Sequence, residues 1–265
     1  MTARLSVEPN DRITFGVAYE DEHVVVAAKP PGIVTTPGLG HESDSLLNAL
    51  FARHGGRLQQ LGAARDFGLL HRLDRQTSGL VLCALTRQSY DALRAQFESR
   101  EVAKFYWAVV KGAPKREKGV VRLSIAEFRG KTAGDDATKK LAKVARAGAP
   151  AMTAYRILAP GTGCSLLECR AFTGRLHQVR VHLEAIGCPI FGDDFYAPAE
   201  VRSAAPRLML HAHRVVFNHP ATGGPVDCRS KMPADMRGVM KRVGIAWAGE
   251  ETRHDGAEGA RKKTG

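Results

Sequence analysis

Residues 69–85 read LLHRLDRQTSGLVLCAL, and two apolar runs in this stretch enclose a polar turn. The second run, residues 79–85, is aliphatic and β-branched, which is typical of a buried strand. The turn places one carboxylate, Asp74, among a histidine and two arginines. Charged residues on a loop that core strands hold are often functional. The same spacing also fits a solvated turn whose polar side chains only hydrogen-bond local backbone, so the stretch alone leaves both interpretations open.

The composition limits the class of protein and the class of binding partner that the chain can have. The 265 residues suffice for one large domain or two small ones with a substantial core. The chain has 39 basic and 27 acidic residues, a formal charge of +12 and a pI near 9.8. This excess favours RNA or DNA as a partner, then an anionic membrane surface, although a basic protein without such a partner has the same balance.

Neither a membrane span nor a secretory signal is predicted. No apolar run reaches the ~18 residues that a span needs, and residues 1–12 contain no apolar signal core, so we expect a cytoplasmic protein. The five cysteines are odd in number and form no CxxC pair. They therefore predict reduced core thiols rather than a disulfide framework or a zinc site.

Alternation and capping patterns predict strands and helices in a single domain. Strands are expected at residues 13–18, 23–28, 79–85, 104–111, 152–158 and 165–171, with a hairpin at 208–218 and 226–228. Helices are expected after Asp44 or Ser45, after Thr86, and at residues 176–186 and 233–243. We interpret residues 52–66, 111–118 and 130–148 as connections, the last a mobile, lysine-rich arm suited to RNA phosphates. The expected division is a flexible lead at 1–12, one domain at 13–245 and a disordered tail at 246–265.

Two of these elements carry side chains whose positions indicate a cleft. Alternation along the strand at 104–111 puts Tyr106 on the face opposite Phe105 and Trp107, which we expect in the core. In the helix at 176–186, Arg180 lies at the border of the apolar stripe, while His177 points away from the stripe. A guanidinium at the edge of a buried face needs a partner, because burying it unpaired is costly.

Five motifs occur together in one order. Residues 71–79 (HRLDRQTSG) resemble the HRLDxxTSG signature of RNA pseudouridine synthases of the RluA type. Residues 29–32 (KPPG) resemble that family's KPxG loop, and residues 104–111 resemble its tyrosine-bearing strand. Residues 174–180 (GRLHQVR) are similar to its GRxHQ[IVL]R segment, and residues 192–193 to its GD turn. The resemblance covers nearly all of the chain outside its two ends.

The resemblance implies a fold and a reaction. The fold is α+β, with a large, mainly antiparallel mixed sheet flanked by helices and bent around a central catalytic cleft. The reaction isomerises specific uridines of structured ribosomal or transfer RNA to pseudouridine, after the base is flipped out of its stack. It involves no redox change, so no cofactor and no metal are expected. The stretch before residue 13 does not match the S4-type RNA-binding module of many relatives, so RNA affinity is expected from the catalytic domain of a monomer.

The resemblance also implies roles for single residues. Asp74 is the expected nucleophile, which attacks C1′ or C6 of the uridine. Arg180 is the expected cation that keeps Asp74 ionised in a closed site. Tyr106 is expected to stack on the uracil and to take the C5 proton, directly or through water. RNA contacts are expected from Arg72, which enters the space that the flipped uridine leaves, and from His71, Arg75, Lys29 and Arg175, with His71 also supporting the loop.

Two other functions remain open at this point. A metal-dependent hydrolase would use His177, His182, His211 and His213, although the first two are five residues apart and do not share a helix face. A non-catalytic RNA-binding protein on the same scaffold is the other alternative, which the joint presence of Asp74, Tyr106 and Arg180 disfavours.

Overall fold

One large mixed sheet forms the framework of the protein, whose computed structural model describes residues 5–132 and 135–249. Along the sheet the described strands are β1 (Gly16–Glu20), β2 (Val24–Lys29), β3 (Ser78–Ala84), β10 (Leu210–Asn218), β4 (Ala103–Lys111), β9 (Cys164–Ala171), β8 (Thr153–Gly161) and β5 (Lys118–Val121), with β11 (Pro225–Arg229) on β10. These neighbours pair antiparallel except β3 and β10, which run parallel. The predicted α+β fold with a mainly antiparallel sheet is confirmed.

The parallel contact between β3 and β10 joins the two halves of the sheet. Ser78 pairs with His211 and Gly79 with Ala212. Gly79 has a φ of +116°, and a Cβ there would lie 2.2 Å from the carbonyl oxygen of Ala212. Only glycine allows so close an approach of the two backbones, so the sequence of the HRLDxxTSG-like motif directly determines this junction.

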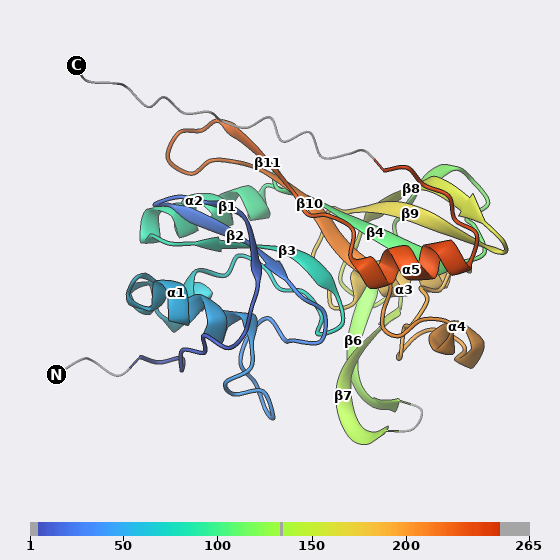
Figure 1. Ribbon diagram of the computed structural model, residues 1–265, viewed down its shortest axis with the longest axis horizontal. Helices are drawn as coiled ribbons and strands as arrows, with labels where there is room; N and C mark the ends of the chain where they lie inside the picture. The colour runs from blue at the N-terminus through green and yellow to red at the C-terminus, as the bar shows by residue number, and fades with distance from the viewer. Residues whose placement is uncertain (1–4, 133–134, 250–265) are drawn as a thin grey trace.

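Two hydrophobic clusters lie on either side of this junction (Figure 1). The first contains β1, β2 and β3 with helices α1 (Leu46–Leu61) and α2 (Arg87–Glu98). The second contains β4, β8 and β9 with helices α3 (Gln178–Ala185), α4 (Ala199–Ser203) and α5 (Ala234–Arg242). Tyr106 on β4 packs against both clusters, which places this residue at the centre of the fold.

The predicted capping residues begin the first two helices. The Ser45 hydroxyl accepts from the backbone N–H of Asn48, whose side chain accepts from the Ser45 N–H in return. Thr86 caps α2 through the N–H of Ser89. The strand predictions hold within a few residues. The first predicted strand, 13–18, lies at Gly16–Glu20.

Two predicted connections are wrong. Residues 52–66 continue α1 through a break at His54 to Leu61 and then form the 3₁₀ helix η1 (Ala63–Gly68), because burial of Leu58 and Leu61 outweighs the low helix propensity of two glycines. Residues 130–148 are mostly strand: β6 (Ile125–Thr132) and β7 (Asp135–Val144) pair as a separate hairpin.

The hairpin β6–β7 extends away from the main sheet (Figure 1). Its base is anchored by a third apolar cluster, in which Ile125 and Ala142 pack with Ala151 and with Val181 of α3. The lysines that suggested a mobile arm, Lys139, Lys140 and Lys143, therefore lie on a strand in which Leu141 and Ala142 are buried.

The described ends of the chain pack on the domain. Val7 is buried in the first cluster, and the Asn48 side chain on α1 donates to the carbonyl of Glu8. At the other end, the Trp247 ring meets Trp107 edge-on with centroids 5.0 Å apart. The division at residues 13 and 245 stays a prediction, and most of the predicted tail, residues 250–265, lies outside the described residues.

All five cysteines are free and buried, as predicted. Within the described part of the chain, no helix is long and apolar enough to cross a membrane. Phe105 and Trp107, expected in the core, are only partly buried on the face of β4 opposite Tyr106, where arginine side chains lie against Phe105 and His213 stacks on Trp107.

Candidate active site

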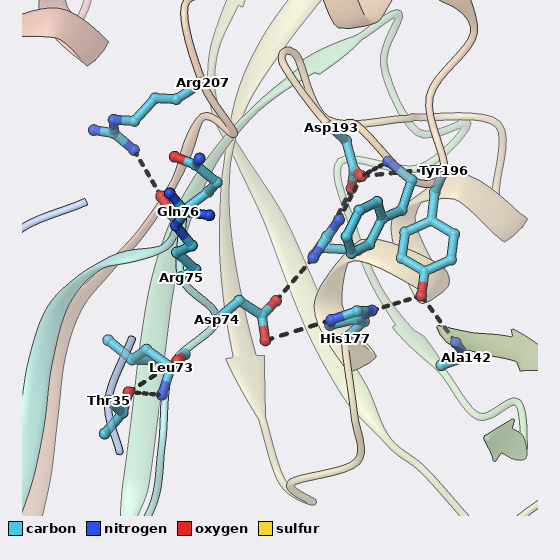
Figure 2. Close-up of polar contacts among 12 residues, drawn as sticks. Thr35, Leu73, Asp74, Arg75, Gln76, Ala142, His177, Asp193, Tyr196 and Arg207 are labelled. Atoms are coloured by element: carbon cyan, nitrogen blue, oxygen red, sulfur yellow. Dashed lines mark hydrogen bonds and ion pairs between the residues drawn. The ribbon is translucent and has the colours of Figure 1, made fainter. Parts of the chain in front are cut away.

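The loop between η1 and β3 carries Asp74, and the loop after β2 fixes its backbone. The Thr35 hydroxyl accepts from the N–H of Leu73 and donates to its carbonyl, at 3.0 and 2.9 Å. The carbonyl of Arg75 accepts from the N–H of Gly32 at 2.8 Å. These contacts bracket Asp74 on both sides, so the carboxylate is presented by a rigid backbone rather than by a mobile loop (Figure 2).

Lys29, predicted to contact RNA phosphate, forms part of this support and faces the protein interior. It is only 1% exposed, and its ammonium lies 2.8–3.2 Å from the carbonyl oxygens of Pro30, Ile33 and Arg75. Burial lowers the pKa of Lys29 to about 7. A polar group can be buried here because the turn at the KPPG segment and the Asp74 loop direct three carbonyls toward one point.

His71 is likewise a structural residue. Its Nε2 accepts the backbone N–H of Leu82 on β3 at 3.1 Å, and its ring lies against Phe97. Burial, together with the nearby charge of Lys104, lowers the pKa of His71 to about 3. The ring is therefore neutral at physiological pH and offers no positive charge to RNA. His71 thus contacts β3 beside the loop, and its RNA contact stays a prediction.

Asp74 and Arg180 form the ion pair that the resemblance implied, although they are distant in sequence. Arg180 Nη1 donates to Asp74 Oδ2 at 3.1 Å. The guanidinium is 6% exposed and the carboxylate 26% exposed, so the pair opens to solvent only on the side of Asp74. Asp74 is held by one oxygen, which leaves Oδ1 directed away from the arginine.

Asp193 is a second carboxylate on Arg180 that sequence reasoning missed. Its side chain is 1% exposed and accepts from Arg180 Nε and Nη2 at 2.8 and 2.6 Å. Asp193 Oδ1 also accepts from the backbone N–H groups of Phe195 and Tyr196. Burial opposes the charge on Arg180, but Asp193 and then Asp74 outweigh burial and raise the pKa of the guanidinium. The only signal in the sequence was the GD turn at residues 192–193.

The rings of Phe195 and Tyr196 complete the surroundings of Arg180. Their centroids lie 4.8 and 5.0 Å from the guanidinium carbon, within the range of cation–π contacts. Both residues follow the turn that carries Asp193, so one short segment supplies the carboxylate and the rings. Arg180 is thereby fixed in orientation before any substrate binds.

His177 is a further residue that the sequence placed wrongly. The helix starts at Gln178, and His177 precedes it in a left-handed conformation with φ of 52°, so helical spacing does not apply to it. Its Nε2 lies 3.8 Å from Asp74 Oδ1, and its Nδ1 lies 2.6 Å from the Tyr196 hydroxyl (Figure 2). Burial lowers the pKa of His177 to about 4, although Asp74 acts in the opposite direction.

A hydrogen-bond chain connects His177 to the hairpin β6–β7. The Tyr196 hydroxyl accepts the backbone N–H of Ala142 on β7 at 2.9 Å, which directs its own proton toward His177 Nδ1 (Figure 2). The proton of the neutral imidazole then resides on Nε2 and faces Asp74. One histidine tautomer is thus selected by a contact to the backbone of another element.

Tyr106 lies close enough to Asp74 for their charges to interact, which agrees with a shared site. Burial and the Asp74 carboxylate both raise the pKa of the Tyr106 phenol. Its register, opposite Ala212 on β10 and Cys169 on β9, places it in the middle of the sheet. Tyr106 is outside the set of residues that line the open cleft.

The cleft over Asp74 has a volume of about 450 Å³. Its walls come from the loop at 34–38, the loop at 72–76, the start of α3 and the turn at 192–195. Cationic side chains line it from two sides: Arg72 and Arg75 from the Asp74 loop, and Lys139 and Lys140 from β7. Arg72 and Arg75 thus lie where RNA contacts were predicted.

Arg175, the remaining predicted RNA contact, is exposed beside the cleft rather than in it. Its Nε donates to the carbonyl of Pro150 at 3.3 Å. Its guanidinium remains accessible to a phosphate at the edge of a bound RNA.

The four histidines of the metal alternative do not converge. His182 contacts Thr153 and the carbonyl of Leu123, and His211 contacts Ser78. His213 stacks on Trp107 and lies beside Glu168. Across residues 5–132 and 135–249, no group of three or more His, Cys, Asp or Glu side chains is arranged to hold a metal ion.

Comparison with known proteins identifies the same family. The sequence model of the RNA pseudouridylate synthase family matches residues 23–185. The chain is 36% identical over 250 residues to the ribosomal large subunit pseudouridine synthase D of Zymomonas mobilis, a match that covers 90% of this chain and 75% of that protein. It is 37% identical over 225 residues to the dual-specificity RNA pseudouridine synthase RluA of Escherichia coli K12, covering 83% and 93%.

Solved structures agree with this comparison. The human RNA pseudouridylate synthase domain containing 4 matches with a TM-score of 0.65 at 25% identity, over 87% of this chain and 94% of that chain. The chain therefore belongs to the RNA pseudouridylate synthase family. It is an RNA pseudouridine synthase, an isomerase that acts on RNA, as the sequence motifs predicted.

Proposed function

We propose that Asp74 is the nucleophile of the isomerisation. The observation that carries this proposal is the asymmetry of its carboxylate: Oδ2 is held by Arg180, while Oδ1 faces the cleft side at 3.8 Å from His177. Attack by a carboxylate oxygen at C1′ breaks the bond to N1, whereas attack at C6 forms an adduct on the base. Either route splits one difficult rearrangement into two steps, and the carboxylate departs in the second.

Arg180 keeps the carboxylate charged and oriented in this proposal. A nucleophilic carboxylate must stay ionised when an RNA base closes the cleft and excludes water. Arg180 supplies that charge from a position fixed by Asp193, Phe195 and Tyr196. The cation is therefore preorganised and pays no reorganisation cost at the moment of reaction.

Tyr106 is proposed to contact the uracil and to mediate removal of the C5 proton. The uracil must turn after detachment so that C5 faces C1′, and the C5 proton must then leave. The raised pKa of Tyr106 keeps the phenol protonated at neutral pH. The C5 proton therefore passes through a water molecule or is taken up as the phenol releases its own proton.

The proposed RNA contacts are cations at the cleft: Arg72, Arg75 and Lys140, which are exposed, the partly exposed Lys139, and Arg175 at its edge. Phosphate contacts of this kind position RNA without reading its sequence. Large-subunit ribosomal RNA is the proposed substrate class, because one relative is named for that activity and another is named dual-specificity. We further propose that the enzyme is a monomer and that it acts in the cytoplasm, where that RNA is made.

The test measures tritium release from RNA labelled at C5 of uridine. Asp74→Asn keeps the shape of the side chain and removes the charge, so release should stop while RNA binding changes less than about threefold. Asp91→Asn on α2 is the matched control, since this carboxylate is exposed and pairs with Arg65 far from the cleft. Release by Asp74→Asn at the wild-type rate would overturn the assignment of the nucleophile.

A further inference from the structure

A second groove on the described surface lies away from the catalytic cleft. It has a volume of about 880 Å³ and is formed by Trp107 on β4, by α5 and by the segment that follows α5. Trp107 points to the opposite side of the sheet from Tyr106, since successive side chains of a strand alternate. The groove therefore opens on the face of the sheet that the reaction does not use.

Two tryptophan rings form the apolar part of this groove. Trp107 stacks on His213 with centroids 3.9 Å apart and an interplanar angle of 6°, and Trp247 meets Trp107 edge-on. Both tryptophans are only partly buried. Because the Trp107 ring is already stacked on His213 and met edge-on by Trp247, an unpaired nucleobase would stack on the parts of the two tryptophans that stay exposed, and such stacking tolerates any base.

Cations surround the rings on the groove side. Lys231, Lys241 and Arg237 are exposed and line the groove, and no Asp or Glu is among the described residues that line it. A groove that combines stacking surfaces with cations and lacks carboxylates is complementary to a nucleotide, which has a flat base and an anionic phosphate.

The same face continues this pattern along the sheet. Phe105 shares the face of Trp107 on β4, and the guanidiniums of Arg170 and Arg214 lie 5.7 and 5.1 Å from its ring centroid. Arg170 also lies 4.4 Å from the ring of Phe172. Aromatic rings and arginines thus adjoin on this face from β9 across β4 to the groove, together with two carboxylates that pair with its cations, Glu168 with His213 and Asp227 with Arg214.

We propose that this groove and the adjoining aromatic row bind an unpaired segment of the RNA substrate, as a second RNA-binding surface on the face opposite the catalytic cleft. The segment must be unpaired because a duplex hides the faces of its bases. RNA is favoured over other polyanions because the enzyme acts on RNA and because the rings add stacking to charge. The proposal does not depend on Asp74 as the nucleophile.

Intrinsic fluorescence reports directly on this surface. The chain contains two tryptophans, Trp107 and Trp247, and both line the groove. The full-length protein is titrated with a 12-nucleotide oligouridylate, which has no stable structure, at low and at high salt. Binding in the groove should quench tryptophan emission with a saturable curve that weakens at high salt, because phosphate contacts release counterions.

Charge-reversal variants locate the binding. The double variant Lys231→Glu/Lys241→Glu should raise the Kd from quenching at least about tenfold, since each lost phosphate contact weakens binding and each new carboxylate repels. The matched control Arg53→Glu/Arg57→Glu makes the same charge change on α1, at the other end of the molecule (Figure 1), and should leave the Kd within about twofold. Arg72→Glu in the cleft should also leave the quenching curve unchanged.

Three results would overturn the proposal. One is a tryptophan emission that stays constant while the oligonucleotide binds by an independent measurement, which would mean that another occupant, such as a peptide segment, covers the groove. A second is quenching that survives the Lys231→Glu/Lys241→Glu change. A third is quenching lost in Arg72→Glu, which would place the RNA in the cleft. Tritium release by wild-type protein is unaffected by any of these results, so the proposed function is tested separately.

Discussion

Asp193 is expected to be the most sensitive position of the site, although it does not contact the substrate in the proposed reaction. Its carboxylate and the Arg180 guanidinium are 1% and 6% exposed and share two hydrogen bonds of 2.6 and 2.8 Å. Asp193→Ala would leave a buried guanidinium with Asp74 as its remaining carboxylate partner. Breaking a buried pair in this way costs about 3–5 kcal/mol of unfolding free energy.

That loss translates into a measurable melting shift. For a domain of this size, 1 kcal/mol corresponds to about 2–4 °C in Tm, so Asp193→Ala should melt about 6–20 °C below the wild type in circular dichroism. Tritium release should fall at least about 100-fold, because Arg180 would be free to turn fully onto Asp74 and occupy both of its oxygens. Asp193→Asn, which keeps the acceptor for the N–H groups of residues 195 and 196, should lose about half as much stability.

Asp235 supplies the matched control. It also binds an arginine through two oxygens, Arg207 at 2.6 and 2.9 Å, but it is 36% exposed. Solvent screening should limit the cost of Asp235→Ala to about 1 kcal/mol. Equal melting temperatures for the Asp193→Ala and Asp235→Ala variants would refute the argument that burial of the Asp193–Arg180 pair holds the site together.

Four further outcomes are expected. His177→Asn and Tyr196→Phe should each lower kcat in the tritium assay, with a smaller change in KM. The double variant should be no less active than the more damaging single variant, because both changes break the same hydrogen-bond chain to β7. Additive losses of activity would contradict this coupling. Lys29→Met should lower Tm, since three carbonyls lose their donor, but should leave the RNA Kd within about threefold; a tenfold weaker Kd at unchanged Tm would restore a phosphate role. Gly79→Ala should prevent folding to a stable domain, as judged by thermal melting, because its Cβ would overlap the Ala212 carbonyl at 2.2 Å; a wild-type Tm would contradict that. The pKa of His71 is lowered to about 3 in the fold, so its ring is neutral there, whereas in the unfolded chain it binds a proton below pH about 6.5. The unfolding free energy should therefore fall on acidification from pH 6.5, by up to about 1.4 kcal/mol per pH unit, and His71→Gln should reduce that slope. An unfolding free energy that rises on acidification would have the wrong sign.

Local patterns in the sequence were sufficient for most of the framework. The caps at Ser45 and Thr86 depend on one side chain and a few neighbouring N–H groups, and the structure has them as predicted. The buried strand after Asp74 is recognisable because its side chains are apolar on both faces. The hairpin β6–β7 was missed because its alternation is weak and its burial depends on α3, an element much later in the chain.

The partners within the site were harder to predict, because they come from contacts between distant segments. The border position of Arg180 indicated that it needs a partner, but the pattern could not say that Asp193 binds it more closely than Asp74. His177 was placed by helical spacing, which fails one residue before the helix starts. Lys29 was assigned to RNA from the family resemblance alone, and its burial became visible only with the fold.

The parallel pairing of β3 with β10 has a consequence for how the enzyme folds during synthesis on the ribosome. Strand β10 joins the two halves of the sheet, because its His211 and Ala212 pair with Ser78 and Gly79 of β3. Asp74, Arg180 and Asp193 precede β10 in the sequence, so all three leave the exit tunnel before it. At translation speeds of about 5–20 residues per second, β3 waits roughly 6–25 s with one edge open. A nascent chain halted before β10 thus contains every proposed catalytic group and is still inactive. The unpaired edge of its β3 strand is where a chaperone would be needed.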